Sequence, residues 1–88
     1  MPYQASVTVH DPIGLHARPA GQIVKLVKES GFEVQLTNDS GASAAASSAL
    51  RMMAMKVKSG EVLTVTVETD DDAAAAAIVE QIQDFLKG

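Results

Sequence analysis

The sequence predicts an open-faced α/β sandwich, in which helices cover one side of a single sheet. Four segments have the apolar pattern of strands and three have that of helices, in the order strand, helix, strand, strand, helix, strand, helix. Each strand has one apolar face, which a single layer of helices is enough to cover. A chain of 88 residues can build only one thin core, so we expect one domain over residues 1–88.

The first strand and the first helix are predicted from two different spacings of apolar residues. Apolar and polar residues alternate over residues 3–9, which is typical of a strand with one buried face. Pro12 and Gly14 interrupt this pattern and predict a loop. From 17 to 27 the apolar residues recur at helical spacing, and Gly31 is expected to cap the end of this helix.

A hairpin and a second helix are predicted in the middle of the chain. Residues 32–37 alternate again, and the turn residues of 38–41 follow them. The stretch 41–49 consists almost wholly of Gly, Ala and Ser, and we interpret it as a short edge strand and a loop. The second helix is expected to begin with Ser47 or Ser48 as its N-cap.

The last strand and the third helix complete the predicted fold. Residues 61–69 alternate with a strongly apolar face, as expected of a central strand. Residues 69–72 then offer capping oxygens and negative charge, which favour the start of a helix. The apolar residues of that helix recur at helical spacing, namely Ala75, Ile78, Ile82, Phe85 and Leu86.

The composition excludes several classes of protein. Eleven acidic residues against seven Lys or Arg give a formal charge of −4, which argues against a nucleic-acid or anionic-membrane partner. The chain has no Cys, so disulfides, thiol nucleophiles and Cys-based zinc sites are excluded. Residues 1–9 do not read as a secretory signal, and no apolar run approaches a membrane span. We therefore expect a cytoplasmic protein without direct membrane insertion.

The segment Gly14 to Ala20 is the unusual element of the sequence. It reads Gly-Leu-His-Ala-Arg-Pro-Ala and places His16 at the predicted N-terminus of the first helix, with Pro19 in the first turn. The backbone N–H groups at that end have no helical partner, so they can hold an anion. Because His is not a favoured N-cap residue, a local rule is broken here, as happens preferentially at functional sites.

The residue types in this segment suit phosphoryl transfer. A neutral imidazole is a nucleophile, and the guanidinium of Arg18 can stabilise phosphoryl oxygens. An exposed loop His beside a solvated Arg is the alternative for any such pair. His10 has no comparable surroundings and is interpreted as structural or solvated. We expect no metal site, since residues 70–72 are explained by helix capping, and no glycine-rich loop is present to bind a nucleotide cofactor.

These seven residues resemble the active-site signature of the HPr family, the phosphocarriers of the bacterial phosphoenolpyruvate:sugar phosphotransferase system. The resemblance extends over the whole chain. It implies an α+β open-faced sandwich, with a four-stranded antiparallel sheet covered on one face by three helices. It also implies that His16 accepts a phosphoryl group at Nδ1 from phosphorylated enzyme I and passes it to enzyme II A-type domains for sugar uptake. Arg18 matches the family's active-site arginine, and the chain would be a monomeric carrier without a cofactor rather than an independent catalyst.

The resemblance implies a regulatory site and a docking surface as well. Ser47 matches the serine on which HPr kinase/phosphorylase acts in many members, although Ala46 stands where the family often has a basic residue. The expected docking surface surrounds His16 and the second helix, and comprises Leu15, Ala17, Ala20, Ser48, Ala49, Met52 and Met53. Two alternatives stay open: a regulatory binding module switched by Ser47, and a carrier of the nitrogen-related phosphotransferase system.

Overall fold

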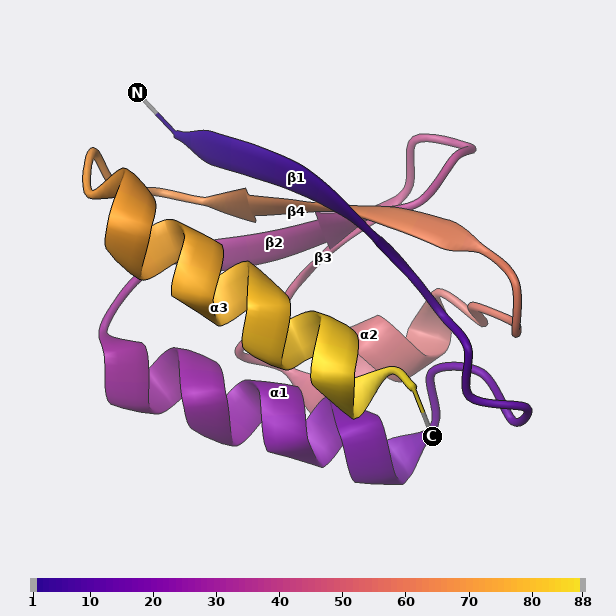
Figure 1. Cartoon of the computed structure of the whole chain (residues 1–88). Coiled ribbons are helices and arrows are strands. Elements are labelled where there is room, and N and C mark those ends of the chain that lie inside the picture. The colour runs from indigo at the N-terminus through magenta and orange to yellow at the C-terminus, as the bar shows by residue number, and fades with distance from the viewer. Residues whose placement is uncertain (1, 88) are drawn as a thin grey trace.

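The computed structural model describes residues 2–87, which form an antiparallel four-stranded sheet with three helices on one face (Figure 1). The sheet has the order β1-β4-β2-β3. The predicted open-faced sandwich is therefore confirmed. Its elements are β1 (Tyr3–Thr8), α1 (Ala17–Ser30), β2 (Val34–Thr37), β3 (Ser43–Ala45), α2 (Ala49–Ala54), β4 (Val62–Val67) and α3 (Asp72–Phe85).

The strand β4 lies in the middle of the sheet, as the sequence predicts. It pairs with β1 on one side and with β2 on the other, both antiparallel. Leu63, Val65 and Val67 point into the core and are fully buried. The strand ends before the predicted limit at residue 69: the N–H of Glu68 still donates to the Glu33 carbonyl in the β2–β4 register, but the N–H of Thr69 turns back to the Val67 carbonyl. The short β3 forms the edge, also as predicted.

The ends of the long helices follow from their capping residues. Gly31 adopts a left-handed conformation with φ of 77° and donates to the Val27 carbonyl, so it ends α1 as predicted. Asp71 caps α3 by accepting the N–H of Ala74. Both helices have 14 residues, and no helix within residues 2–87 is long and apolar enough to cross a membrane.

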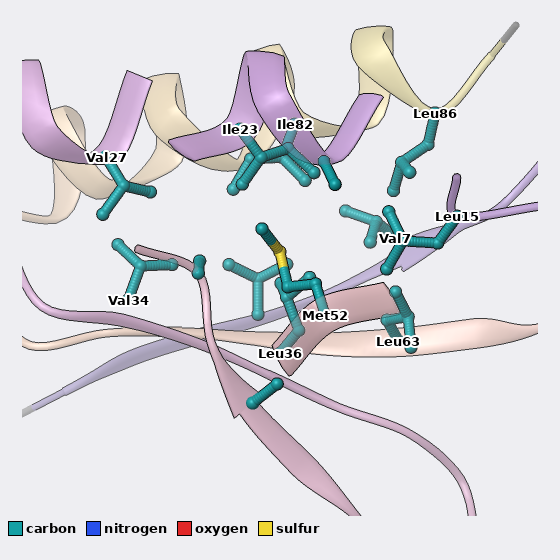
Figure 2. Packing of buried hydrophobic residues seen from close by; sticks show 14 of the residues in the cluster. Val7, Leu15, Ile23, Val27, Val34, Leu36, Met52, Leu63, Ile82 and Leu86 are labelled. Carbon is teal, nitrogen blue, oxygen red and sulfur yellow. The ribbon is translucent and has the colours of Figure 1, made fainter. Parts of the chain in front are cut away.

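The core lies between the sheet and the helices. Figure 2 shows Met52 at its centre, between Leu36 on the sheet side and Ile23 and Ile82 on the helix side. All four of these side chains have no exposed surface. Val27 and Val34 lie at one end of this core, and the other end contains a cluster near the start of α1 that includes Leu15, Leu86, Val7 and Leu63.

Candidate functional site

The loop between β1 and α1 is fixed to the rest of the fold by backbone hydrogen bonds. The N–H groups of His10 and Asp11 both donate to the Leu86 carbonyl at 2.8 Å, just after α3. Further along the loop, the N–H of Leu15 donates to the Val57 carbonyl at 3.1 Å. The two ends of the loop are thus tied to segments that lie far away in the sequence. This arrangement gives the start of α1 a fixed position.

Gly14 is required by the path of this loop. Its φ of +88° is a conformation that side chains disfavour, and a Cβ at this position would overlap the Val57 carbonyl oxygen. Glycine therefore lets the loop press against the backbone at 57–58. The next residue, Leu15, is buried and anchors the loop in the core. The buried Leu15 side chain thus fixes the start of α1, and His16 is the next residue of the chain.

His16 is the N-cap of α1, as predicted, and its side chain makes no capping hydrogen bond. The first helical hydrogen bond runs from the N–H of Ala20 to the His16 carbonyl at 3.1 Å. The N–H groups of Ala17 and Arg18 precede it, and the helix offers them no acceptor. The imidazole is 28% exposed and its Nε2 lies 2.9 Å from Asp11 Oδ2. An anion beside the ring would thus meet free backbone donors and the positive end of the helix dipole.

Asp11 is a site residue that the sequence did not predict. It is the buried charged residue within 2–87, with 7% of its surface exposed. Its Oδ1 accepts the N–H of Ile13 at 2.9 Å and its Oδ2 faces His16. The Ile13 N–H, followed by the hydrogen bond with His16, holds the pKa of the Asp11 carboxyl below its ordinary value. In the sequence, Asp11 is one of several turn residues. Only the folded loop shows that its side chain points toward His16.

An open hollow of about 640 Å³ lies beside His16, lined by residues from the start of α1 and from the last turn of α3. His16 and Arg18 both line it, so the structure brings the two predicted residues to one place. Arg18 is exposed. Its guanidinium is therefore available to a phosphoryl group that enters the hollow. The remaining lining residues are Asp11, Pro12, Ile13, Pro19, Gln22, Asp84 and Phe85. No group of His, Asp or Glu in the described part of the chain could hold a metal ion.

The N-cap of α2 is Ser48 and not Ser47. The Ser48 hydroxyl accepts the N–H of Arg51 at 3.3 Å, whereas Ser47 lies in the preceding turn and is exposed. Ser47 lines a second hollow, of about 280 Å³, together with Val27 and Gly31 at the far end of α1. Ser47 therefore does not cap α2 itself but directly precedes the cap, and a regulatory phosphate on Ser47 stays a prediction.

This placement predicts different effects for the two serines. The Ser48→Ala variant should lose about 1 kcal/mol in the free energy of unfolding, because the Arg51 N–H loses its acceptor. The Ser47→Ala variant should change it by less than about 0.5 kcal/mol, because this side chain is exposed and does not cap the helix. Urea denaturation of both variants measures the difference. Equal losses, or a larger loss for Ser47→Ala, would contradict the assigned cap.

The predicted docking surface is partly wrong. Leu15, Ala20 and Met52 belong to the core, with at most 5% of their surface exposed, so no partner can reach them. The spacing of apolar residues in a helix as short as α2 did not show which of them face inward. The other four members remain at the surface: Ala17 is exposed, and Ser48, Ala49 and Met53 are half-buried.

Two exposed apolar residues were missed by the sequence analysis. Ile13 and Leu50 expose 74% and 78% of their surface. Ile13 lines the hollow beside His16, and Leu50 lies in the first turn of α2. His10 is exposed, in agreement with its interpretation as a solvated residue.

Comparisons with known proteins agree with this geometry. Residues 3–87 match the family model described as "PTS HPr component phosphorylation site". The phosphocarrier protein HPr of Borreliella burgdorferi is 36% identical over 73 residues, which cover 82% of this chain and 84% of that protein. The phosphocarrier protein NPr of Escherichia coli K12 is 31% identical over 80 residues and 89% of both chains. The crystal structure of an HPr from Bacillus anthracis superposes with a TM-score of 0.81 at 26% identity, covering 97% of this chain and 96% of the other.

Proposed function

We propose that this chain, which belongs to the HPr family of phosphocarrier proteins, carries its phosphoryl group on His16. The observation that supports this assignment best is the position of the imidazole. It is the N-cap of α1, it makes no capping bond, and it lines a hollow together with Arg18. His10 offers none of these features, because it is exposed and lies outside that hollow.

The surroundings of His16 suit the transfer of a phosphoryl group between proteins. The ring nitrogen Nδ1 is the expected acceptor, because Nε2 is engaged with Asp11. The oxygens of the transferred group would be stabilised by the N–H groups of Ala17 and Arg18 and by the Arg18 guanidinium. Since the site is partly open to solvent, a partner can both deliver the phosphoryl group and remove it.

The proposed donor is phosphorylated enzyme I, and the proposed acceptors are enzyme II A-type domains that serve sugar uptake. We expect this relay to operate in the cytoplasm. Relatives named HPr and NPr both match the chain, so a role in the nitrogen-related system is the second candidate. Initial rates of transfer from the enzyme I of each system distinguish them. A faster reaction with the sugar-system enzyme I supports the first candidate, and the reverse order supports the second.

Incubation with phosphoenolpyruvate and enzyme I tests the proposed carrier function. We expect about one phosphoryl group per chain, stable in alkali and released in acid, as expected for a phosphoramidate. Omission of enzyme I is the control and should leave the chain unlabelled. No incorporation from either enzyme I, or incorporation only in an acid-stable form, would contradict the proposal.

The Arg18→Ala variant is expected to slow the transfer at least about tenfold, because the developing charge on the phosphoryl oxygens loses its cation. Its free energy of unfolding should change by less than about 0.5 kcal/mol, since Arg18 is exposed. Rapid-quench measurement of the initial rate and urea denaturation give the two values. Lys28→Ala removes a positive charge from the last turn of the same helix and should keep the wild-type rate. Equal slowing by both variants would show that Arg18 contributes only general charge.

A further inference from the structure

Asp11 is held in a single orientation by bonds that have no part in phosphoryl binding. Its own N–H donates to the Leu86 carbonyl, and its carbonyl accepts the N–H of Gly14 at 2.9 Å. In the side chain, Oδ1 accepts the N–H of Ile13 at 2.9 Å. Only Oδ2 is left to face His16, at 2.9 Å from Nε2. The imidazole therefore meets a carboxylate oxygen whose direction the loop determines.

The chemistry of a carboxylate decides where the hydrogen of this bond lies. The pKa of Asp11 is lowered, mainly by the Ile13 N–H and next by the bond with His16, so the group is ionised near neutral pH. An ionised carboxylate can only accept hydrogen bonds. The hydrogen must then reside on Nε2 of His16. A neutral imidazole carries one N–H, so Nδ1 is left with its lone pair.

We propose that Asp11 is a positioning residue, which holds His16 in the Nε2–H tautomer and thereby presents Nδ1 as the phosphoryl acceptor. This inference rests on the proposed carrier function. Asp11 acts only through the ring, in the way that carboxylates and carbonyls orient other functional histidines by accepting from the second ring nitrogen. It fixes both the reactive atom and the direction of the ring before a partner binds.

The transfer balances without the movement of a proton. The Nδ1 lone pair forms the bond to phosphorus, while the bond from phosphorus to the donor protein's leaving atom breaks and its electron pair returns to that atom. The ring keeps its hydrogen on Nε2 and becomes positively charged, which the adjacent Asp11 carboxylate stabilises. In the onward step the pair of the N–P bond returns to Nδ1, and the Nε2–H tautomer is restored.

The Asp11→Asn variant tests this role because it reverses the polarity of one hydrogen bond. The Ile13 N–H still requires an acceptor, so the amide oxygen of Asn should keep that place and the amide nitrogen should face His16. The Nε2 atom then becomes an acceptor and the ring hydrogen moves to Nδ1. We expect the initial rate of phosphoryl uptake to fall at least about tenfold. Asp39→Asn is the matched control, because it removes one negative charge from the exposed β2–β3 turn, and it should keep the wild-type rate.

The tautomer itself is measured by nitrogen NMR on histidine-labelled protein without phosphate, at alkaline pH where the imidazole is neutral. The chain has two histidines, so His10→Ala identifies the His16 signals. We expect the N–H at Nε2 in the wild type and at Nδ1 in Asp11→Asn. A wild-type ring with its hydrogen on Nδ1 would overturn the proposal even if the variant did not fold. A slow variant that keeps the Nε2–H tautomer, or a fast one that has lost it, would overturn it too.

These readouts separate the positioning role from the carrier function. If the tautomer behaves as expected but the wild type takes up no phosphoryl group from either enzyme I, the carrier function fails while Asp11 still orients the ring. If the wild type is phosphorylated on His16 and the tautomer does not depend on Asp11, the carrier function stands and the positioning role is rejected.

Discussion

Replacing His16 by Ala is expected to abolish phosphoryl uptake, because the hollow then has no imidazole on which a phosphoramidate can form: its other polar lining side chains are Asp11, Arg18, Gln22 and Asp84. The variant should stay folded. The imidazole makes no capping bond and is partly exposed, so its loss removes mainly the hydrogen bond with Asp11 Oδ2 and should lower the free energy of unfolding by about 1–3 kcal/mol. Incubation with phosphoenolpyruvate and enzyme I, followed by measurement of acid-labile phosphate, gives the result.

The matched control for this experiment is His10→Ala. His10 is exposed and lies on the same loop, so its replacement removes the other imidazole of the chain without removing a residue of the hollow. It should be phosphorylated to the wild-type level. If the His16→Ala variant were labelled at full stoichiometry while His10→Ala was not, the assignment of the phosphoryl acceptor would be reversed.

The Met52→Ala variant is expected to lose about 2–5 kcal/mol in the free energy of unfolding, a large part of the stability of a small domain. Met52 has no exposed surface and lies between the helices and the sheet (Figure 2). Truncation leaves a cavity lined by neighbours such as Leu36 and Ile82, which cannot fully close around it. Urea denaturation measures the loss.

Met53→Ala is the control for this prediction. Met53 is the next residue of α2 and is only half-buried, so its replacement should destabilise the chain clearly less than that of Met52. Where the Met52→Ala chain remains folded, its apparent KM for enzyme I should be close to that of the wild type. If the Met52→Ala variant lost little stability and had a raised KM for enzyme I, Met52 would be assigned to the docking surface and not to the core.

The regular elements could be predicted because their patterns are long. The alternation along β1 and β4 and the helical spacing in α1 and α3 each extend over enough residues to show one buried face. In α2 the pattern fails. This helix has six residues and its apolar side chains point in more than one direction, so periodicity could not separate the buried Met52 from the half-buried Met53 and the exposed Leu50.

The site residues that stand together in one short segment could be predicted from the sequence. The residue that the fold of the loop brings to them could not. His16, Arg18 and Gly14 stand together in one short segment, and helix-end physics alone explains why an anion would bind there. Two adjacent serines can both cap a helix, so only the turn after β3 decides in favour of Ser48. Asp11 reaches His16 because the loop folds back between Leu86 and Val57. The spacing of residues in the sequence does not predict the contact between Asp11 and His16.

The position of the phosphoryl group on the intact protein can be observed by nitrogen and phosphorus NMR after charging with enzyme I and phosphoenolpyruvate. We predict that Nδ1 of His16 shows coupling to phosphorus, while Nε2 of His16 and both ring nitrogens of His10 do not. Coupling at His10 or at Nε2 of His16, or a phosphate on Ser47 with both rings unmodified, would contradict the assignment of His16 Nδ1 as the carrier atom.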